Sequence, residues 1–158
     1  MANVSVLGAG SWGLGLALLL NNNGHNVTVW SVLKDEVAML QTEREHKRCL
    51  PGVKIPDSIT VSGDTENVIG SADVLVLAVA SPYTRSTAKM IAPFVKEGQI
   101  IVNVAKGVEE HTLLTLCHIV EEEIPCAKVA VLSGPSHAEE VSRGIPTTCV
   151  IGAHEKAP

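Results

Sequence analysis

The sequence feature that most constrains the fold is a G-x-G-x-x-G motif at Gly8, Gly10 and Gly13, directly after the mainly apolar run Val4–Leu7. In a dinucleotide-binding unit the first glycine permits a tight turn, and the second lets the pyrophosphate approach the backbone. The third lets the next helix pack closely on the sheet, with its N-terminus facing the phosphates. A helical apolar pattern and then a second strand-like run, at 26–30, follow the motif. This order predicts dinucleotide binding, whereas a simple turn would explain only one glycine.

Strand and helix patterns alternate along the whole chain. Short aliphatic runs fit strands that are covered on both faces, and the segments between them have apolar residues at helical spacing. This alternation predicts an α/β fold of the Rossmann type, with one doubly wound, mostly parallel sheet in a single domain over residues 1–158. The predicted strands are 3–7, 26–30, 59–61, 74–79, 100–104, 129–132 and 148–151, and the predicted helices are 11–23, 35–44, 65–69, 84–95 and 111–123.

Composition argues against several classes of function. Hydrophobic residues make up 46% of the 158 residues and charged residues 18%, which suits a buried parallel sheet. A net charge of −5 without a basic cluster argues against nucleic-acid binding. The four cysteines are scattered, which favours reduced thiols in a cytoplasmic protein. The apolar run at 14–20 is too short to span a bilayer, so no membrane insertion is expected.

Several chemically distinctive loops follow predicted strands. Ligands of doubly wound sheets bind beyond the carboxyl ends of the strands, so the glycine loop, Ser81-Pro82, Lys106 and Gly134–Ser136 are expected to line one crevice. Lys106 could hold a hydroxyl, carbonyl or phosphate oxygen of a substrate, or it could simply be solvated. Ser136 has capping-box spacing to Glu139, so we expect it to cap a helix, with or without a role in a ligand site.

The end of the second predicted strand bears on the choice between NAD and NADP. A typical NAD site has Asp or Glu about 20 residues after the glycines, where it accepts hydrogen bonds from the ribose hydroxyls. This chain has Ser31 and Val32 there, followed by Lys34. No carboxylate would repel a 2′-phosphate and a lysine could attract it, so we expect NADPH to bind at least as well as NADH. A solvated lysine at a helix start is the alternative.

The sequence shows no pattern typical of a metal site or a hydrolytic triad. The six histidines lack the spacing of metal ligands, and His111 and His118 lie about two turns apart on the helix predicted at 111–123, too far to chelate one ion. Ser136 and His137 are adjacent, but nothing indicates a third member of a triad. We therefore predict no bound metal.

Three motifs occur in combination, GAGSWG at 8–13, KG at 106–107 and SGPSHAEE at 133–140. Together they resemble the bacterial NAD(P)-dependent glycerol-3-phosphate dehydrogenases. The resemblance implies reversible hydride transfer between NAD(P)H and dihydroxyacetone phosphate, which makes sn-glycerol 3-phosphate for phospholipid synthesis. From the motif, the strand end and the resemblance, the expected coenzyme-binding residues are Gly8, Gly10, Ser11, Trp12, Gly13, Lys34, Lys106 and Ala138, and the expected substrate-binding residues are Lys106, Gly134 and Ser136.

The chain also departs from the family. The family usually has Arg or His at the position of Val32 and Tyr at the position of Cys49. Its general acid/base lysine and its phosphate-binding arginine lie in a second, helical domain beyond these residues. We therefore expect a coenzyme-binding domain without catalytic residues, whose docking face could cause self-association into a homo-oligomer. Two alternatives stay open, a dehydrogenase of the 6-phosphogluconate or ketopantoate reductase type and a stand-alone nucleotide-sensing module.

Overall fold

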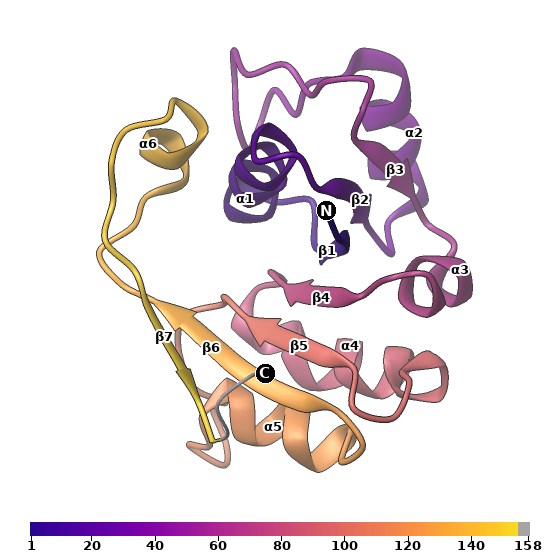
Figure 1. Ribbon diagram of the computed structural model, residues 1–158, viewed down its shortest axis with the longest axis vertical. Coiled ribbons are helices and arrows are strands. Elements are labelled where there is room, and N and C mark those ends of the chain that lie inside the picture. Colours follow the sequence, from indigo (N-terminus) through magenta and orange to yellow (C-terminus); the bar gives the residue numbers. More distant parts are fainter. Residues whose placement is uncertain (155–158) are drawn as a thin grey trace.

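The computed structural model describes residues 1–154, so the last four residues of the domain predicted at 1–158 lie outside the described residues. One seven-stranded sheet, in the order β3-β2-β1-β4-β5-β6-β7, forms its centre (Figure 1). Neighbouring strands are parallel except β7, which runs antiparallel to β6. The predicted α/β class and mostly parallel sheet are confirmed. The strands are β1 (Asn3–Leu7), β2 (Asn26–Trp30), β3 (Thr60–Ser62), β4 (Val74–Leu77), β5 (Ile100–Asn103), β6 (Lys128–Ser133) and β7 (Val150–Ala153).

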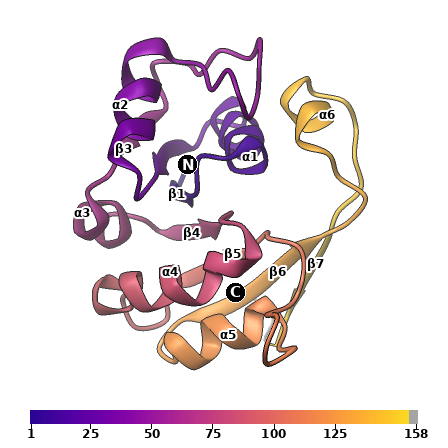
Figure 2. The same cartoon turned by 180° about the vertical axis from the view of Figure 1, so that it is seen from behind.

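Helices cover both faces of the sheet (Figures 1 and 2). Residues of α1 and α2 belong to one apolar cluster, and residues of α3, α4 and α5 belong to a second cluster on the opposite face. None of the helices within residues 1–154 has the length and apolar character needed to cross a membrane. The helices are α1 (Ser11–Asn22), α2 (Lys34–Glu43), α3 (Thr65–Gly70), α4 (Thr84–Ile91), α5 (Leu116–Glu123) and α6 (Ala138–Ser142), with short 3₁₀ turns at Ser81–Tyr83 and Ala92–Phe94.

The central strand β1 shows why the strands of this sheet appear in the sequence as mainly apolar runs. Successive side chains of a strand point to opposite faces. Val6 packs in the cluster that contains α1, and its neighbour Leu7 packs in the cluster that contains α4. Both side chains are fully buried. Because both faces of β1 are covered, the strand has no polar side to alternate with the apolar one.

The helix predicted at 111–123 begins later than the sequence indicated, at Leu116. Leu113 has a left-handed backbone with φ 58°, which a continuing helix cannot contain. The preceding residues instead form a turn closed by an isolated antiparallel bridge between Val108 and Thr115. Thr115 then caps α5, since its side-chain oxygen accepts a hydrogen bond from the backbone N–H of His118. The apolar spacing was therefore misleading over the first turn.

The segment between β6 and β7 leaves the sheet and returns to it (Figure 1). Its outermost part, α6, packs closely on α1, because a Cβ atom at Gly15 would lie 3.2 Å from the carbonyl oxygen of Ala138. The outgoing and returning arms pass each other at Gly134, where a Cβ atom would lie 2.5 Å from the oxygen of Thr148. This excursion reverses the direction of the chain, so the last strand, β7, runs antiparallel to β6. The strand lies at Val150–Ala153 rather than at the predicted 148–151.

Candidate functional site

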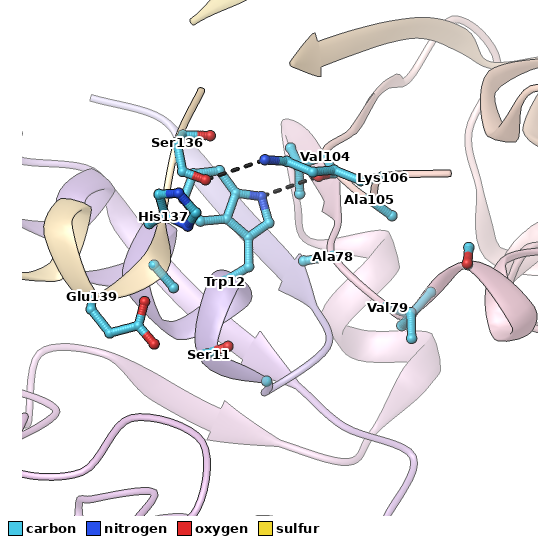
Figure 3. Close-up of a pocket in the computed structure, with 14 residues that line it drawn as sticks. Ser11, Trp12, Ala78, Val79, Val104, Ala105, Lys106, Ser136, His137 and Glu139 are labelled. Carbon is cyan, nitrogen blue, oxygen red and sulfur yellow. Dashed lines mark hydrogen bonds between the residues drawn. The ribbon is translucent and has the colours of Figure 1, made fainter. Parts of the chain in front are cut away.

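A cavity of about 520 Å³ lies at the carboxyl ends of the central strands (Figure 3). It adjoins the point where the chain order reverses, with β2 on one side of β1 and β4 on the other. Doubly wound sheets bind ligands at such points. The structure thus brings together the four loops that the sequence predicted to share a crevice. The lining residues are Gly10, Ser11, Trp12, Ala78, Val79, Ala80, Ser81, Val104, Ala105, Lys106, Ser136, His137, Ala138 and Glu139.

The three motif glycines occupy three different environments at the β1–α1 turn. Gly8 has φ +117°, and a Cβ atom there would lie 2.9 Å from the backbone of Ala78. A Cβ atom at Gly13 would lie only 2.0 Å from the carbonyl oxygen of Gly8. Gly10 differs, because a Cβ atom there would meet no atom within 4 Å and the residue lines the cavity. Gly8 and Gly13 are therefore required by the fold, whereas Gly10 keeps space open for a ligand.

The N-terminus of α1 faces this space with its backbone donors available. Gly10 is the N-cap residue, no side chain caps the helix, and no acidic residue stands in the first turn. The first N–H groups of a helix have no partner within the helix, and the helix dipole favours an anion beside them. A 12-residue helix with this exposed end is a suitable site for a phosphate group.

Trp12 and Lys106 lie near each other in the cavity wall (Figure 3). The indole Nε1 of Trp12 donates a hydrogen bond to the carbonyl oxygen of Val104 at 3.1 Å, which fixes the ring against the end of β5. The Lys106 ammonium donates to the carbonyl oxygens of Gly134 at 3.3 Å and Ser136 at 3.2 Å. Among the lining residues within the described chain, Lys106 is the only lysine or arginine. An anionic ligand that entered here would meet this exposed cation.

Ser136 does not cap a helix, so that part of the sequence prediction was wrong. The N-cap of α6 is His137, and the helix begins at Ala138. The Ser136 hydroxyl instead lies 3.5 Å from the carbonyl oxygen of Gly134, to which its own N–H also donates. Because Ser136 is used to complete this tight turn, the next residue, His137, takes the N-cap position and α6 starts one residue later than the capping-box spacing predicts. Ser136 is left buried at the cavity wall, while Gly134 lies behind it and contributes only its carbonyl oxygen.

A second cavity, of about 220 Å³, lies at the tip of β2 and contains Lys34. The structure therefore separates Lys34 from the other expected site residues. Val32 and Ser31 line the same cavity, together with residues from α2, Gly63 and Thr65. In dinucleotide-binding folds this strand tip is where the adenosine ribose is recognised. Lys34 is exposed at the first position of α2, where its ammonium is free to reach a ligand.

The expectation that no carboxylate stands at the tip of β2 was wrong. Glu36 lies in the first turn of α2, and its carboxylate accepts a hydrogen bond from the Ser31 hydroxyl at 2.5 Å. The other carboxylate oxygen contacts Nε2 of the buried His46 at 3.1 Å. The backbone N–H of Cys49 donates to Nδ1 of His46, so the hydrogen on Nε2 points at Glu36. Because Glu36 lies in the first turn of α2, its carboxylate reaches Ser31 at the tip of β2, although sequence spacing alone places Glu36 too far along the chain.

Seven lining residues were not expected from the sequence to belong to the site, namely Ala78, Val79, Ala80, Val104, Ala105, His137 and Glu139. Each follows a strand or opens α6, next to a residue that was singled out. The small and apolar residues among them carry no chemical pattern of their own, and His137 and Glu139 were considered only for a triad and a capping box. The available signal was their position directly after predicted strands, because every strand tip at this edge of the sheet meets the cavity.

Comparison with known proteins gives a consistent result. Residues 3–158 match the family model described as NAD-dependent glycerol-3-phosphate dehydrogenase N-terminus. The chain is 61% identical over 97% of its length to a glycerol-3-phosphate dehydrogenase [NAD(P)+] of Agathobacter rectalis, and 51% identical over 99% to that of Fusobacterium nucleatum. A crystal structure of glycerol-3-phosphate dehydrogenase from Coxiella burnetii superposes with a TM-score of 0.91 at 28% identity, over 98% of this chain and 47% of that one. The chain spans about half the length of these curated relatives, 46% and 47%.

Proposed function

Because the chain belongs to the family of the NAD-dependent glycerol-3-phosphate dehydrogenase N-terminus, we propose that it is the coenzyme-binding domain of that oxidoreductase. The reaction is the reversible reduction of dihydroxyacetone phosphate by NADH or NADPH to sn-glycerol 3-phosphate, a precursor of phospholipids. The β1–α1 turn carries the proposal, since Gly10 alone of the three motif glycines leaves open space beside an uncapped helix end. The family match does not favour the 6-phosphogluconate or ketopantoate reductase reading or the sensing module.

The coenzyme would bind with its pyrophosphate on the backbone amides at the start of α1. The helix dipole and the free N–H groups would compensate the two negative charges without a basic side chain. The nicotinamide ring would extend into the larger cavity, where Ser11, Trp12 and Ala138 line the wall. The adenosine ribose would lie at the tip of β2, beside the second cavity.

The phosphorylated substrate would bind on the far side of the nicotinamide, against Lys106 and Ser136. The Lys106 ammonium now donates to two carbonyl oxygens, and a substrate oxygen is a stronger acceptor when it carries charge. Lys106 could therefore exchange these contacts for the substrate. We assign it a binding role toward both coenzyme and substrate, and assign no acid/base catalyst within these residues. The 158-residue chain alone should then bind coenzyme with almost no turnover of dihydroxyacetone phosphate.

A titration tests the proposal most directly. Trp12 lines the cavity, so addition of NADH or NADPH should change its fluorescence in a saturable way. The Gly10→Ala substitution places a methyl group in open space, so the chain should fold normally but lose about tenfold or more in coenzyme affinity, since the phosphates need a close backbone approach. Gly70→Ala is the matched control, because Gly70 also has open space but lies on α3. Equal affinities of the two variants would contradict the proposal.

We also propose that NADPH binds at least as well as NADH. Lys34 at the tip of β2 supports this choice, while the Glu36 carboxylate at the same place opposes it. Both carboxylate oxygens of Glu36 already contact Ser31 and His46, and Lys34 is the one charged residue among those that line the second cavity in the described chain. Lys34→Gln should weaken NADPH binding more than NADH binding, and Lys89→Gln on α4, across the sheet, should change neither. A large preference for NADH in the unaltered chain would overturn this assignment.

The remaining expectations about partners and location stay proposals. The dehydrogenase would act on a small phosphorylated molecule in the cytoplasm, without nucleic acid, in keeping with the net charge of −5. Exposed apolar side chains on β7, Val150 and Ile151, supply a surface on which the chain could form a homo-oligomer. Sedimentation at two protein concentrations would measure that association.

A further inference from the structure

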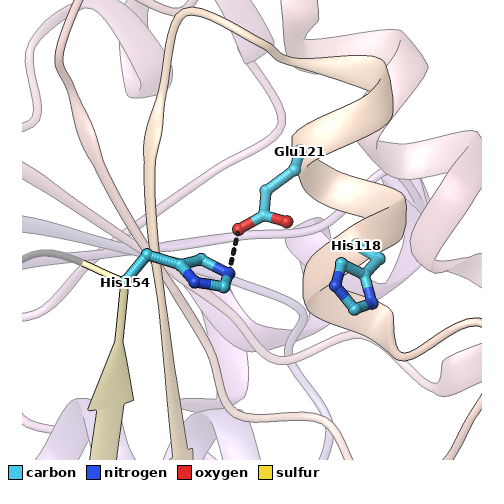
Figure 4. A group of neighbouring side chains, drawn as sticks. All are labelled: His118, Glu121 and His154. Carbon is cyan, nitrogen blue, oxygen red and sulfur yellow. Dashed lines mark ion pairs between the residues drawn. The ribbon is translucent and has the colours of Figure 1, made fainter.

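Three metal-ligating side chains converge on the outer surface of the domain, away from the cavities described above (Figure 4). His118 and Glu121 are three residues apart on α5, which places them on one face of the helix. His154 directly follows β7, the strand that pairs with β6 at the edge of the sheet. One ligand atom from each of the three residues lies within 4.8 Å of the other two.

The spacing within this group already approaches that of a coordination site. Ligand atoms around a tetrahedral zinc ion lie roughly 3.3 Å apart, given metal–ligand bonds of about 2.0–2.1 Å. Glu121 Oε1 and His154 Nε2 are 3.3 Å apart. The His118 side chain is exposed, so its ring can complete the set by a small rotation without disturbing the core.

The charge around α5 favours a cation at this position. The helix ends in three consecutive glutamates and has no basic residue in its last turn, so these charges oppose the helix dipole. Arg85 compensates Glu122 and Glu123, with contacts of 3.0 Å and 2.5 Å. Glu121 pairs only with His154 within the described part of the chain. Its carboxylate thus carries a negative charge that a bound cation would compensate.

The ligand chemistry selects a particular class of ion. Two imidazoles and one carboxylate suit Zn²⁺ and related transition metals, whereas Mg²⁺ and Ca²⁺ prefer oxygen ligands alone. The Thr115 hydroxyl lies 3.0 Å from Nδ1 of His118, which orients the ring and leaves Nε2 for a metal. We propose that His118, Glu121 and His154 form a Zn²⁺ site that joins α5 to the end of β7. Three protein ligands leave a fourth position for water.

The proposed site departs from the expectation, drawn from histidine spacing, that the chain binds no metal. On the sequence alone, His118 was weighed only against His111, which was judged too distant to share an ion, and His111 lies in the turn before α5, outside the group. The histidine that lies close to His118 is His154, 36 positions later in the chain. Only the antiparallel return of β7 beside β6 brings His154 to α5.

Calorimetric titration of the chelator-treated chain with ZnCl₂ tests the proposal. We expect one Zn²⁺ per chain, a higher thermal unfolding midpoint with Zn²⁺, and no comparable binding of Mg²⁺. His118→Ala, Glu121→Gln and His154→Ala should each lower the Zn²⁺ affinity about tenfold or more. His111→Ala and Cys149→Ser are the controls, because each removes an exposed potential ligand outside the group.

All three ligands are exposed or half-buried, so the variants should fold, and circular dichroism would verify this. Three results would each overturn the proposal. The first is no saturable Zn²⁺ binding by the unaltered chain. The second is binding that His118→Ala and His154→Ala leave unchanged, and the third is a loss of affinity in Cys149→Ser that equals the loss in those variants.

Discussion

Two regions of the molecule supply parts of the wall of the same cavity, and they are built differently. The first is the β1–α1 unit, residues 3–22, in which four of the five strand residues and most of the first helical turns are buried. The second is the β6–α6–β7 excursion, residues 128–153, whose strand residues are half-buried or exposed. Val150 and Ile151 are 67% and 66% exposed, whereas Val6 and Leu7 are fully buried.

This difference separates a wall that is fixed by core packing, at the glycine turn, from a wall carried by the more exposed segment 128–153. Local opening costs least where few apolar contacts are buried. The glycine turn is fixed by packing on both faces of β1, while Ser136 and Ala138 lie in the stretch between β6 and β7, which packs on α1 through α6. The glycine turn should therefore be preorganised, and the wall that contains Ser136 and Ala138 should adjust when a ligand binds.

The largest expected effect comes from truncating one apolar side chain in each region. Leu7→Ala should lower the free energy of unfolding by about 2–5 kcal/mol, because it deletes a fully buried side chain and leaves a cavity. Ile151→Ala should change it by no more than about 0.5 kcal/mol, since that side chain is exposed. Urea denaturation followed by circular dichroism measures both values. Similar losses in the two variants would remove the distinction between the regions.

A second, smaller effect uses one glycine from each region. A Cβ atom at Gly13 would lie 2.0 Å from the Gly8 carbonyl oxygen, and both groups belong to rigid backbone. Gly13→Ala should therefore cost about 3 kcal/mol and also weaken coenzyme binding. At Gly152 the nearest atom would be a methyl group of Val131 at 3.3 Å, which can move aside, so Gly152→Ala should be within about 0.5 kcal/mol of the unaltered chain. A tolerated Gly13→Ala would show that the turn is looser than its geometry indicates.

The same contrast explains how far the fold could be predicted. Around β1 the local signals agree, since the apolar run, the three glycines and the helical spacing of α1 all follow from burial. Residues 108–115 and 134–149 lack that agreement. Leu113 looks like part of an apolar helical stripe, yet it is 73% exposed in a left-handed turn. The direction of β7 depends on where α6 docks, and nothing in the strand's own residues records it.

The residues of the candidate site likewise fall into those that a local motif predicts and those that depend on contacts between elements. Gly10, Ser11 and Trp12 lie in the cavity as expected because a local motif holds them. Lys34 lies apart from them at the tip of β2, and Glu36 reaches Ser31 through the turn of a helix rather than through strand spacing. The group formed by His118, Glu121 and His154 has no local signal, since two chain segments must meet to form it. Sequence patterns report contacts within one element far better than contacts between elements.

The smallest expected effect contrasts residues 3–22 with a third segment, the turn after Lys106, in their response to pH. Residues 3–22 contain no titratable side chain, whereas the turn after Lys106 depends on ion pairs. Hydrogen bonds from the Arg85 guanidinium, and one from the Thr112 hydroxyl, lower the pKa of Glu109 from 4.5 to about 2. A lowered carboxyl pKa contributes stability above the unfolded value, and that contribution is lost as the pH falls from 4.5 toward about 2. Glu109→Gln should therefore be less stable than the unaltered chain at neutral pH. The difference should shrink as the pH falls below 4.5 in urea titrations, and a constant difference would mean that Glu109 acts through packing alone.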